Sequence, residues 1–280
     1  MNGSSLVSDA DAPDAAITAE RAELKYLVLP ERLPALLRTI ATRLAAHRFT
    51  GEAANRLPGA EHHVTTIYFD TPSRAYFTAA RANRHSHVKL RAKEYYDLHP
   101  ALAELATDPE QILHHQPWLW FELKRREGLI TSKRRFRFPK AAAASLFRER
   151  ERDVALPGDA AELAEARALI DHVRAQSESI APSAVVNYRR SSFQNADSTL
   201  RVTVDLGLAY FAVPSDVFER ARPLARGELG RPLGVERRAV VEVKRLLPEP
   251  EWLRQALVEA AGGAASFSKF IAASEAAYGA

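Results

Sequence analysis

The segment HSHVKLRAKE, residues 85–94, places a basic residue at every second position from Lys89 to Lys93, with apolar residues between them. A helix would scatter these cations around its axis, whereas a β-strand sends alternate side chains to opposite faces. The segment therefore predicts a strand with one cationic face and one apolar face. A solvated edge strand would explain this segment taken alone, so the interpretation depends on the other strands.

Most of the other predicted strands repeat this alternation. Glu-x-Lys flanked by apolar residues occurs three times, and further strands alternate charged or polar residues with Phe, Val or Leu. The polar faces obtained in this way contain Glu23 and Lys25; Glu122 and Lys124; Lys133, Arg135 and Arg137; Tyr188 and Arg190; Arg201, Thr203 and Asp205; and Glu242 and Lys244.

Two arrangements can accommodate so many charged faces. A flat sheet would expose a heavily basic surface on which like charges lie side by side, which is destabilising. A sheet curled into a barrel would turn the apolar faces outward under helices and the charged faces inward around a lumen. Cations gathered in a lumen need an anion or water to neutralise them. The pattern favours the second arrangement, with a polyanion as the natural ligand.

Composition narrows the class of protein. The net charge is only +4 over 280 residues, so anion binding must come from the arrangement of the basic residues. The chain has no cysteine, which excludes disulfides, thiolate metal sites and a cysteine nucleophile, and we expect a cytoplasmic protein. Residues 1–20 lack the features of a signal peptide, and no apolar run approaches the roughly 18 residues of a membrane span. We expect a flexible tail over 1–20 and a single domain over 21–280, and we predict no oligomeric state.

The order of elements predicts an α+β fold. Strands are expected at 22–28, 64–71, around Lys89, 118–126, 131–138, 183–193, 200–211 and 238–245. Helical segments are expected at 30–49 and 72–83, twice within 140–175, after Pro250 and at 266–278, with a loop at 51–60 and a polar insertion at 95–117.

These motifs together resemble a known family. The three Glu-x-Lys strands, VTTIYFDT, HVKLRAK, YRRSSF, RVTVD and FSKF stand in the order found in the VTC (vacuolar transporter chaperone) domain, over about residues 20–278. This domain is the polyphosphate polymerase branch of the triphosphate tunnel metalloenzymes. The resemblance implies an eight-stranded antiparallel β-barrel tunnel with a basic lumen, covered by helices.

The resemblance also implies an activity and a site. The enzyme would transfer the γ-phosphate of ATP to a growing polyphosphate chain with Mn²⁺ or Mg²⁺, and Glu242 would ligate the metal. Tyr188 would donate its hydroxyl to the substrate, and Lys269 would cap one tunnel mouth. The tunnel-wall cations would be Lys25, Lys89, Arg91, Lys124, Lys133, Arg135, Arg190, Arg201 and Lys244. Lys93 is expected nearer the mouth.

Two other functions stay open. The hydrolase and cyclase branch begins with Glu-x-Glu-x-Lys, whereas this chain has Arg21 at the first glutamate position, which favours the polymerase. A triphosphatase of the same fold is the second enzyme hypothesis, and a non-catalytic polyphosphate-binding module is the third. Nucleic acid is not an expected partner, because the alternation with Phe136 and Phe138 fits RREGLITSKRRFR to a tunnel wall.

Individual residues have simpler interpretations as well. Glu122 is expected to be an ion-pair partner of neighbouring cations, and Asp70 and Asp205 are expected to orient tunnel arginines. Tyr188 could alternatively fill the core. The histidine pairs at 62–63 and 114–115 are expected on the surface, and the three tryptophans are expected to pack.

Overall fold

The computed structural model describes residues 22–47, 61–83, 86–96, 118–127, 130–143, 160–219 and 224–279. The predicted tail at 1–20, the loop at 51–60, most of the insertion at 95–117 and the second histidine pair lie outside the described residues.

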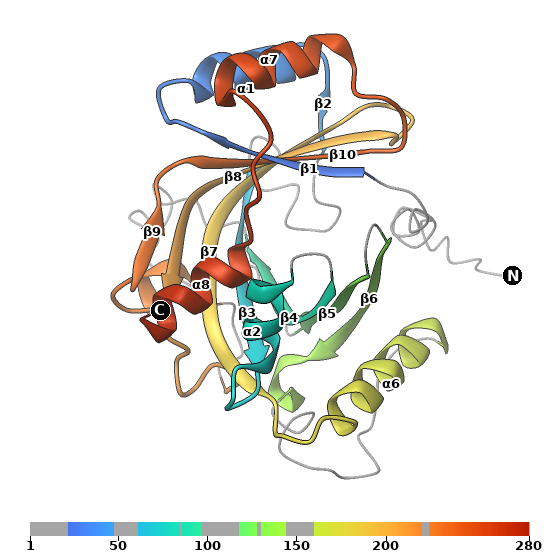
Figure 1. Cartoon of the computed structure of the whole chain (residues 1–280), viewed down its shortest axis with the longest axis vertical. Helices are drawn as coiled ribbons and strands as arrows, with labels where there is room; N and C mark the ends of the chain where they lie inside the picture. The colour runs from blue at the N-terminus through green and yellow to red at the C-terminus, as the bar shows by residue number, and fades with distance from the viewer. Residues whose placement is uncertain are drawn as a thin grey trace, which may run out of the picture.

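One antiparallel sheet organises the fold (Figure 1). Its hydrogen-bonded path runs β1-β10-β8-β7-β3-β4-β5-β6, with the short strands β2 and β9 attached to β7 and β8. The strands on the path are β1 (Ala22–Val28), β3 (Glu61–Asp70), β4 (Ser86–Tyr96), β5 (Trp118–Glu127), β6 (Ile130–Pro139), β7 (Ala181–Gln194), β8 (Leu200–Phe211) and β10 (Ala239–Arg245). The added strands are β2 (Ala45–Ala46) and β9 (Gly234–Glu236).

The sheet is strongly curled but not closed. In Figure 1 it passes from β1 and β10 through the curved strands β8 and β7 to β5 and β6. Within the described residues, β1 pairs only with β10 and β6 only with β5. The antiparallel α+β class and the eight strands of the path agree with the prediction, but the barrel closure does not appear, because no backbone ladder joins the two end strands.

A β-bulge accounts for part of this curvature. The register between β7 and β8 shifts between Asn187 and Arg189. On β8, Gly207 lies close to the shift and has φ of +59°, a backbone conformation that residues with a Cβ rarely adopt. Bulges bend a strand and increase its twist. The extra residue lies on β8, because Asn187 pairs with Ala209 whereas Arg189 pairs with Leu206.

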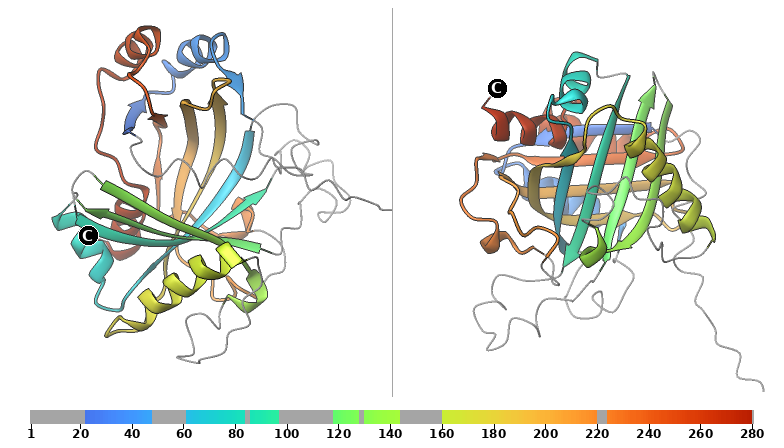
Figure 2. Two further views of the ribbon diagram at one scale, coloured as in Figure 1. Left: turned by 90° about the vertical axis from the view of Figure 1, so that its right-hand side faces the viewer. Right: turned by 90° about the horizontal axis from the view of Figure 1, so that it is seen from below.

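The apolar faces of the strands point outward and are covered by helices (Figure 2). Helices α1 (Leu33–Ala41) and α7 (Glu251–Ala261) cover one hydrophobic cluster over β1, β10 and β8. Helices α2 (Ala75–Ala82) and α6 (Ala160–Arg174) cover a second, larger cluster over the other strands. Helix α8 (Lys269–Tyr278) joins this cluster from the inner side, where Phe270 packs on Tyr68. The core therefore lies between the sheet and the helices, as the outward apolar faces require. None of the described helices has the length and apolar character needed to cross a membrane.

The first helical prediction extends too far. The helix expected over 30–49 ends at Ala41, and the chain then forms the short strand β2 against β7. Between 140 and 175, the described residues contain the short 3-10 helix η3 (Lys140–Ala142) and α6. A second 3-10 helix, η4 (Arg226–Glu228), follows β8. Propensity alone did not show that pairing with β7 would replace the last turns of the first helix.

Asp70 does not orient an arginine, contrary to the prediction. It ends β3, and its carboxylate accepts hydrogen bonds from the backbone N–H groups of Thr71, Tyr76 and Phe77 at 2.8–3.0 Å. The last two donors belong to the first turn of α2, where N–H groups have no partner within the helix. Asp70 therefore links the end of a strand to the start of the helix that covers it.

We expect Asp70→Ala to lower the free energy of unfolding by about 1–2 kcal/mol, the usual cost of losing a helix-capping side chain. Urea denaturation followed by circular dichroism measures this loss. Asp70→Asn is the matched control, because it retains one side-chain oxygen as an acceptor and should lose less. Equal stability of the Ala variant and the original chain would contradict this role.

Candidate functional site

The inner face of the curled sheet collects the charged residues predicted from the alternation. Antiparallel pairing places them in layers across β4, β5 and β6. Lys89, Lys124 and Lys133 lie directly opposite one another in one layer. In the next layer Glu122 lies between Arg91 and Arg135. We call the first the lysine layer and the second the arginine layer.

Glu122 holds the arginine layer together. Its carboxylate lies 2.6 Å from Arg91, 3.1 Å from Lys93 and 3.5 Å from Arg135, and only 3% of its side chain is exposed. Burial would raise the pKa of Glu122, but the surrounding cations, above all Arg91 and Lys93, hold that pKa well below its ordinary value. Glu122 is thus an ion-pair partner, as predicted. Lys93 is buried in this network.

Asp205 forms the second buried ionic centre, and here the prediction that it orients an arginine is confirmed. Its two oxygens accept from Arg190 Nε at 2.6 Å and Nη2 at 2.8 Å, and Lys269 Nζ lies 2.6 Å away. The Tyr188 ring lies beside both cations, 5.3 Å from Arg190 Cζ and 5.1 Å from Lys269 Nζ. Tyr188 therefore fills the core and also faces the charged wall.

The positive charge of the lysine layer is neutralised in a different way. Its carboxylate is Glu23, which comes from β1 across the open side of the sheet. Glu23 lies 3.1 Å from Lys25 and 3.3 Å from Lys124. Glu242 and burial would raise the pKa of Glu23, but Lys124, Lys244 and Lys25 outweigh them and lower it to about 2. This ion pair joins β1 to β5, which are not neighbours in the sheet.

Lys89 has no carboxylate partner in the described part of the chain. Its Nζ donates to the Ser268 hydroxyl at 3.2 Å. Burial, followed by the charges of Lys25 and Lys124, lowers the pKa of Lys89 to about 7. This is what an excess of positive charge does to a lysine that lacks a counter-ion. An anion bound here would raise that pKa again.

The segment between α7 and α8 lies against this layer. The backbone N–H of Ala265 donates to the Lys25 carbonyl at 2.7 Å, and Lys25 Nζ donates to the Phe267 carbonyl at 3.4 Å. Ser268 then begins α8, and its hydroxyl accepts from the backbone of Ile271 at 3.3 Å. These contacts hold Lys269, the first residue of α8, against the inner wall, and Figure 1 shows α8 in front of β7 and β8.

Glu242 is the candidate metal ligand, and the residues around it fit a hard cation only in part. It is buried, lies 2.8 Å from Lys244, and stands directly opposite Thr203 on β8. The Thr203 hydroxyl is buried and has no hydrogen-bond partner among the described residues, so it is a second oxygen donor. No group of three or more acidic or histidine side chains able to hold a metal occurs in the described chain. Mg²⁺ or Mn²⁺ held here would need phosphate oxygens and water as further ligands.

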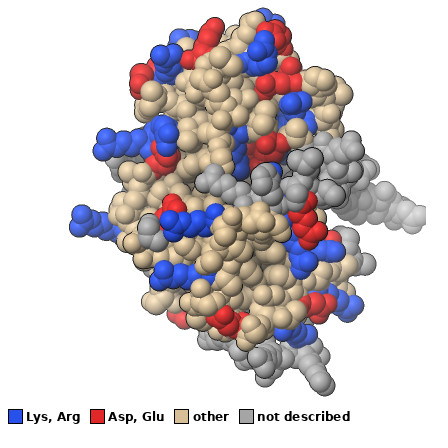
Figure 3. Space-filling view, viewed as in Figure 1, with Lys and Arg blue, Asp and Glu red and all other residues tan. Residues whose placement is uncertain are grey.

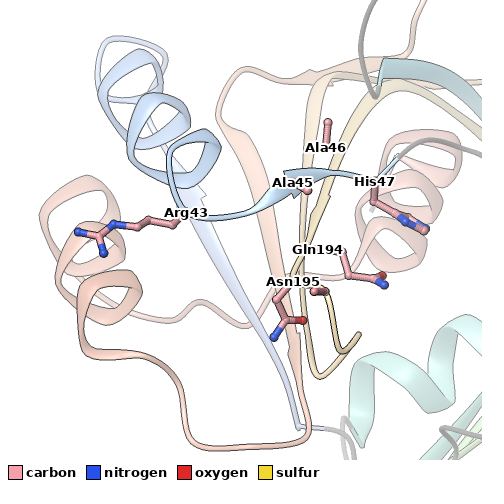
Figure 4. Close-up of a pocket in the computed structure, with 7 residues that line it drawn as sticks. Arg43, Ala45, Ala46, His47, Gln194 and Asn195 are labelled. Carbon is pink, nitrogen blue, oxygen red and sulfur yellow. The ribbon is translucent and has the colours of Figure 1, made fainter.

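Arg201 lies farther along the wall, at the tip of the β7–β8 hairpin. Its Nε donates to the Gln194 side chain at 2.7 Å, and its register partners include Lys244. Gln194 also lines a cavity of about 420 Å³ beside β2 (Figure 4). The described residues that line this cavity include none of the predicted site residues, and in Figure 4 Arg43 points away from Gln194 and Asn195.

Every predicted site residue lies on a strand of the inner wall or, for Lys269, at the start of α8. The structure brings most of them together around Glu23, Glu122, Asp205 and Glu242, whereas Arg201 contacts Gln194 at the hairpin tip. The roles of these residues toward a substrate stay predictions. On the face of the molecule seen in Figure 3, basic and acidic residues are interspersed. Sequence reasoning undervalued Lys93 and Glu23, even though both share the parity of the predicted polar faces.

One histidine prediction is wrong. His62 is buried rather than on the surface, lies opposite Arg190 in the sheet and has its ring 5.7 Å from that of Tyr95. His63 is partly buried and stacks on Tyr96 at 5.1 Å. The position of both residues within β3, rather than in a loop before it, explains their burial.

Comparison with known proteins finds one family. The model of the VTC domain matches residues 20–278. A search of curated proteins finds no match.

Among solved structures, a candidate adenylate cyclase from Bacillus halodurans is 11% identical with a TM-score of 0.49, and covers 90% of this chain and 96% of its own. A candidate adenylyl cyclase from Hippeastrum, described with a dominant triphosphatase activity, is 12% identical with a TM-score of 0.46, and covers 91% of this chain and 95% of its own. Both TM-scores are below 0.5, so the family match carries the assignment.

We expect the inner wall to lose stability in acid through Asp205. Burial would raise its pKa, but Arg190 and Lys269 lower it from the ordinary 3.8 to about 2. The folded state therefore prefers the charged form, and the stabilisation is complete above pH 4 and is lost as pH falls through 2. The loss is about 2 kcal/mol for this group. Urea unfolding at pH 5 and pH 2.5 measures it.

Asp205→Asn is the comparison for that measurement. It should be less stable at pH 5, because it leaves two buried cations without their counter-ion. It should also lose less stability between the two pH values than the original chain. An equal loss in both proteins would show that other groups cause the acid sensitivity.

Proposed function

The chain belongs to the VTC domain family, and from that premise we propose that it transfers the γ-phosphate of ATP to a polyphosphate chain bound along the inner face of the sheet. The supporting observation is the excess of positive charge on that face. The cations there are Lys25, Lys89, Arg91, Lys93, Lys124, Lys133, Arg135, Arg190, Arg201, Lys244 and Lys269, against the carboxylates Glu23, Glu122, Asp205 and Glu242. A polyanion would neutralise the remaining charge through strong hydrogen bonds. The proposal includes the tunnel itself, completed around the substrate by the curled strands.

This wall suits phosphoryl transfer. The reaction depends on positioning and on neutralising charge on the transferred group, with little covalent work for the protein. Arg91 and Arg190 can hold phosphate oxygens in pairs, while Lys89 and Lys124 act as point charges. Arg91 pairs with Glu122 and Arg190 pairs with Asp205. These ion pairs hold the arginines in place, which limits the reorganisation that substrate binding requires.

This mechanism requires no general base in the protein. The terminal phosphate of a polyphosphate chain is anionic near neutral pH, so it can attack without a dedicated base. Tyr188 keeps its proton, because burial above all raises its pKa, and its hydroxyl can donate to a phosphate oxygen. Hydrolysis would additionally need a positioned water.

A divalent ion would be held by Glu242 together with the Thr203 hydroxyl and the phosphate oxygens. When bound, it would neutralise charge on the bridging and terminal phosphate oxygens. The lysines around Glu242 oppose a free dication, so we expect the ion to enter as its complex with the substrate.

Incubation of the purified protein with ATP and Mn²⁺, followed by gel separation of the products, tests the function. We expect chains longer than the starting triphosphate, because the wall can bind a polymer over several layers. Release of free phosphate alone would favour a triphosphatase. Unchanged ATP would favour a binding module, and either result would overturn the polymerase proposal.

We expect Glu242→Gln to lose metal-dependent activity by at least tenfold while the fold is retained, because the amide cannot replace the carboxylate as a charged ligand. Activity at several Mn²⁺ concentrations and thermal unfolding provide the two measurements. Glu236→Gln is the matched control, since Glu236 pairs with Arg238 outside the inner wall. Full activity of the Glu242 variant would contradict the metal assignment.

A further inference from the structure

The lysine layer differs from the arginine layer in where its negative charge comes from. Glu122 stands within the arginine layer, on β5 itself. The corresponding position of β5 in the lysine layer is Lys124, with Lys89 on one side and Lys133 on the other. Like charges directly opposite in a sheet repel each other. Glu23, reaching over from β1, is the carboxylate that contacts Lys124.

The two carboxylates also differ in accessibility. Glu122 is almost fully buried and contacts three cations, so breaking its pairs would be costly. The side chains of Glu23, Lys25 and Lys124 are each about one quarter exposed. Fully exposed ion pairs contribute only about 0–1 kcal/mol, and these partly solvated pairs cost less to break than fully buried ones. The Glu23 pairs can therefore be exchanged, whereas those of Glu122 are part of the scaffold.

Two lysines at this level also donate to neutral acceptors. Lys25 donates to the Phe267 carbonyl at 3.4 Å, and Lys89 donates to the Ser268 hydroxyl at 3.2 Å. Glu23 is thus the carboxylate that contacts both Lys25 and Lys124, while Glu242, which stands opposite Lys25 in the sheet, acts on both lysines through its charge. The carboxylate oxygens of Glu23 occupy the places where phosphate oxygens would bind these two lysines.

We propose that Glu23 is an internal competitor of the phosphate chain, which must displace its carboxylate from Lys124 and Lys25 to bind in the lysine layer. The competition lowers the affinity of the layer and lets a phosphate group leave it again, as a chain that advances along the wall requires. This inference rests on the proposed function for its ligand, and it assigns Glu23 the role of setting affinity rather than of touching the reacting atoms.

Binding of inorganic triphosphate, measured by calorimetry in EDTA, tests this role without turnover or metal. We expect Glu23→Gln to bind about fivefold more tightly than the original chain, the equivalent of ~1 kcal/mol. Glu251→Gln is the matched control, because it removes the same charge from an exposed pair with Arg254 on α7 and should change the affinity less than twofold. Thermal unfolding confirms that each variant is folded, and Glu23→Thr is the second variant, since threonine suits a strand.

A double-mutant cycle separates competition from general repulsion. In the background of Lys124→Met, the gain from Glu23→Gln should fall to about twofold, because the principal cation for which the two anions compete is gone. An undiminished gain would mean that Glu23 repels the ligand without competing for Lys124, and would overturn the proposal.

Two further outcomes distinguish failure of the competitor role from failure of the proposed function. If the original chain binds triphosphate and the folded Glu23→Gln variant binds it equally or more weakly, the competitor role is wrong while the proposed function stands. If the original chain binds no triphosphate, the proposed function and this inference both fail.

Discussion

Buried carboxylates hold the inner wall of this protein together by fixing several cations each. Glu122 gathers Arg91, Lys93 and Arg135, and Asp205 gathers Arg190 and Lys269. Without them the wall would place unpaired charges in a region with little solvent, at a cost that a folded domain cannot sustain. With them, guanidinium and ammonium groups are held in a fixed arrangement before any ligand arrives, and enough positive charge remains for a polyanion.

The rest of the fold follows from turning the charged faces inward. The apolar faces must then be buried on the outside, which requires covering helices there. Helix α8 lies against the inner side instead, since Phe270 packs on Tyr68, the register partner of Arg91, while the adjacent Lys269 reaches Asp205. The bulge beside Gly207 bends β7 and β8 so that the strands can surround the charges. Curvature, covering helices and charge thus depend on one another.

The alternation of residues was sufficient to predict which side chains share the inner face, because parity along a strand is a local property. It could not predict their partners. The sequence showed Asp70 as an acidic residue near basic strands, but its contacts depend on how the chain turns into α2. His62 was expected on the surface because the start of β3 was placed after it, at Val64.

Whether the sheet closes could not be predicted from the alternation either, because closure depends on the twist and register summed over all the strands. The resemblance supplied a closed tunnel, whereas the described chain leaves β1 and β6 unjoined by backbone pairing. For Lys93 and Glu23, too, the sequence predicted the face of the strand but not the contacts. Their parity was evident, but their importance lies in contacts across strands and across the gap.

The junction between β1 and β5 consists of side chains, with Glu23 and Lys124 as its ionic contact, and no backbone ladder crosses it in the described chain. A strand ladder separates only when many hydrogen bonds break together, but a junction of this kind opens at the cost of a few partly solvated contacts. For the polymer substrate proposed above, such an opening would allow entry from the side, at any point along the length of the chain, whereas a barrel closed by a backbone ladder would accept only a free end.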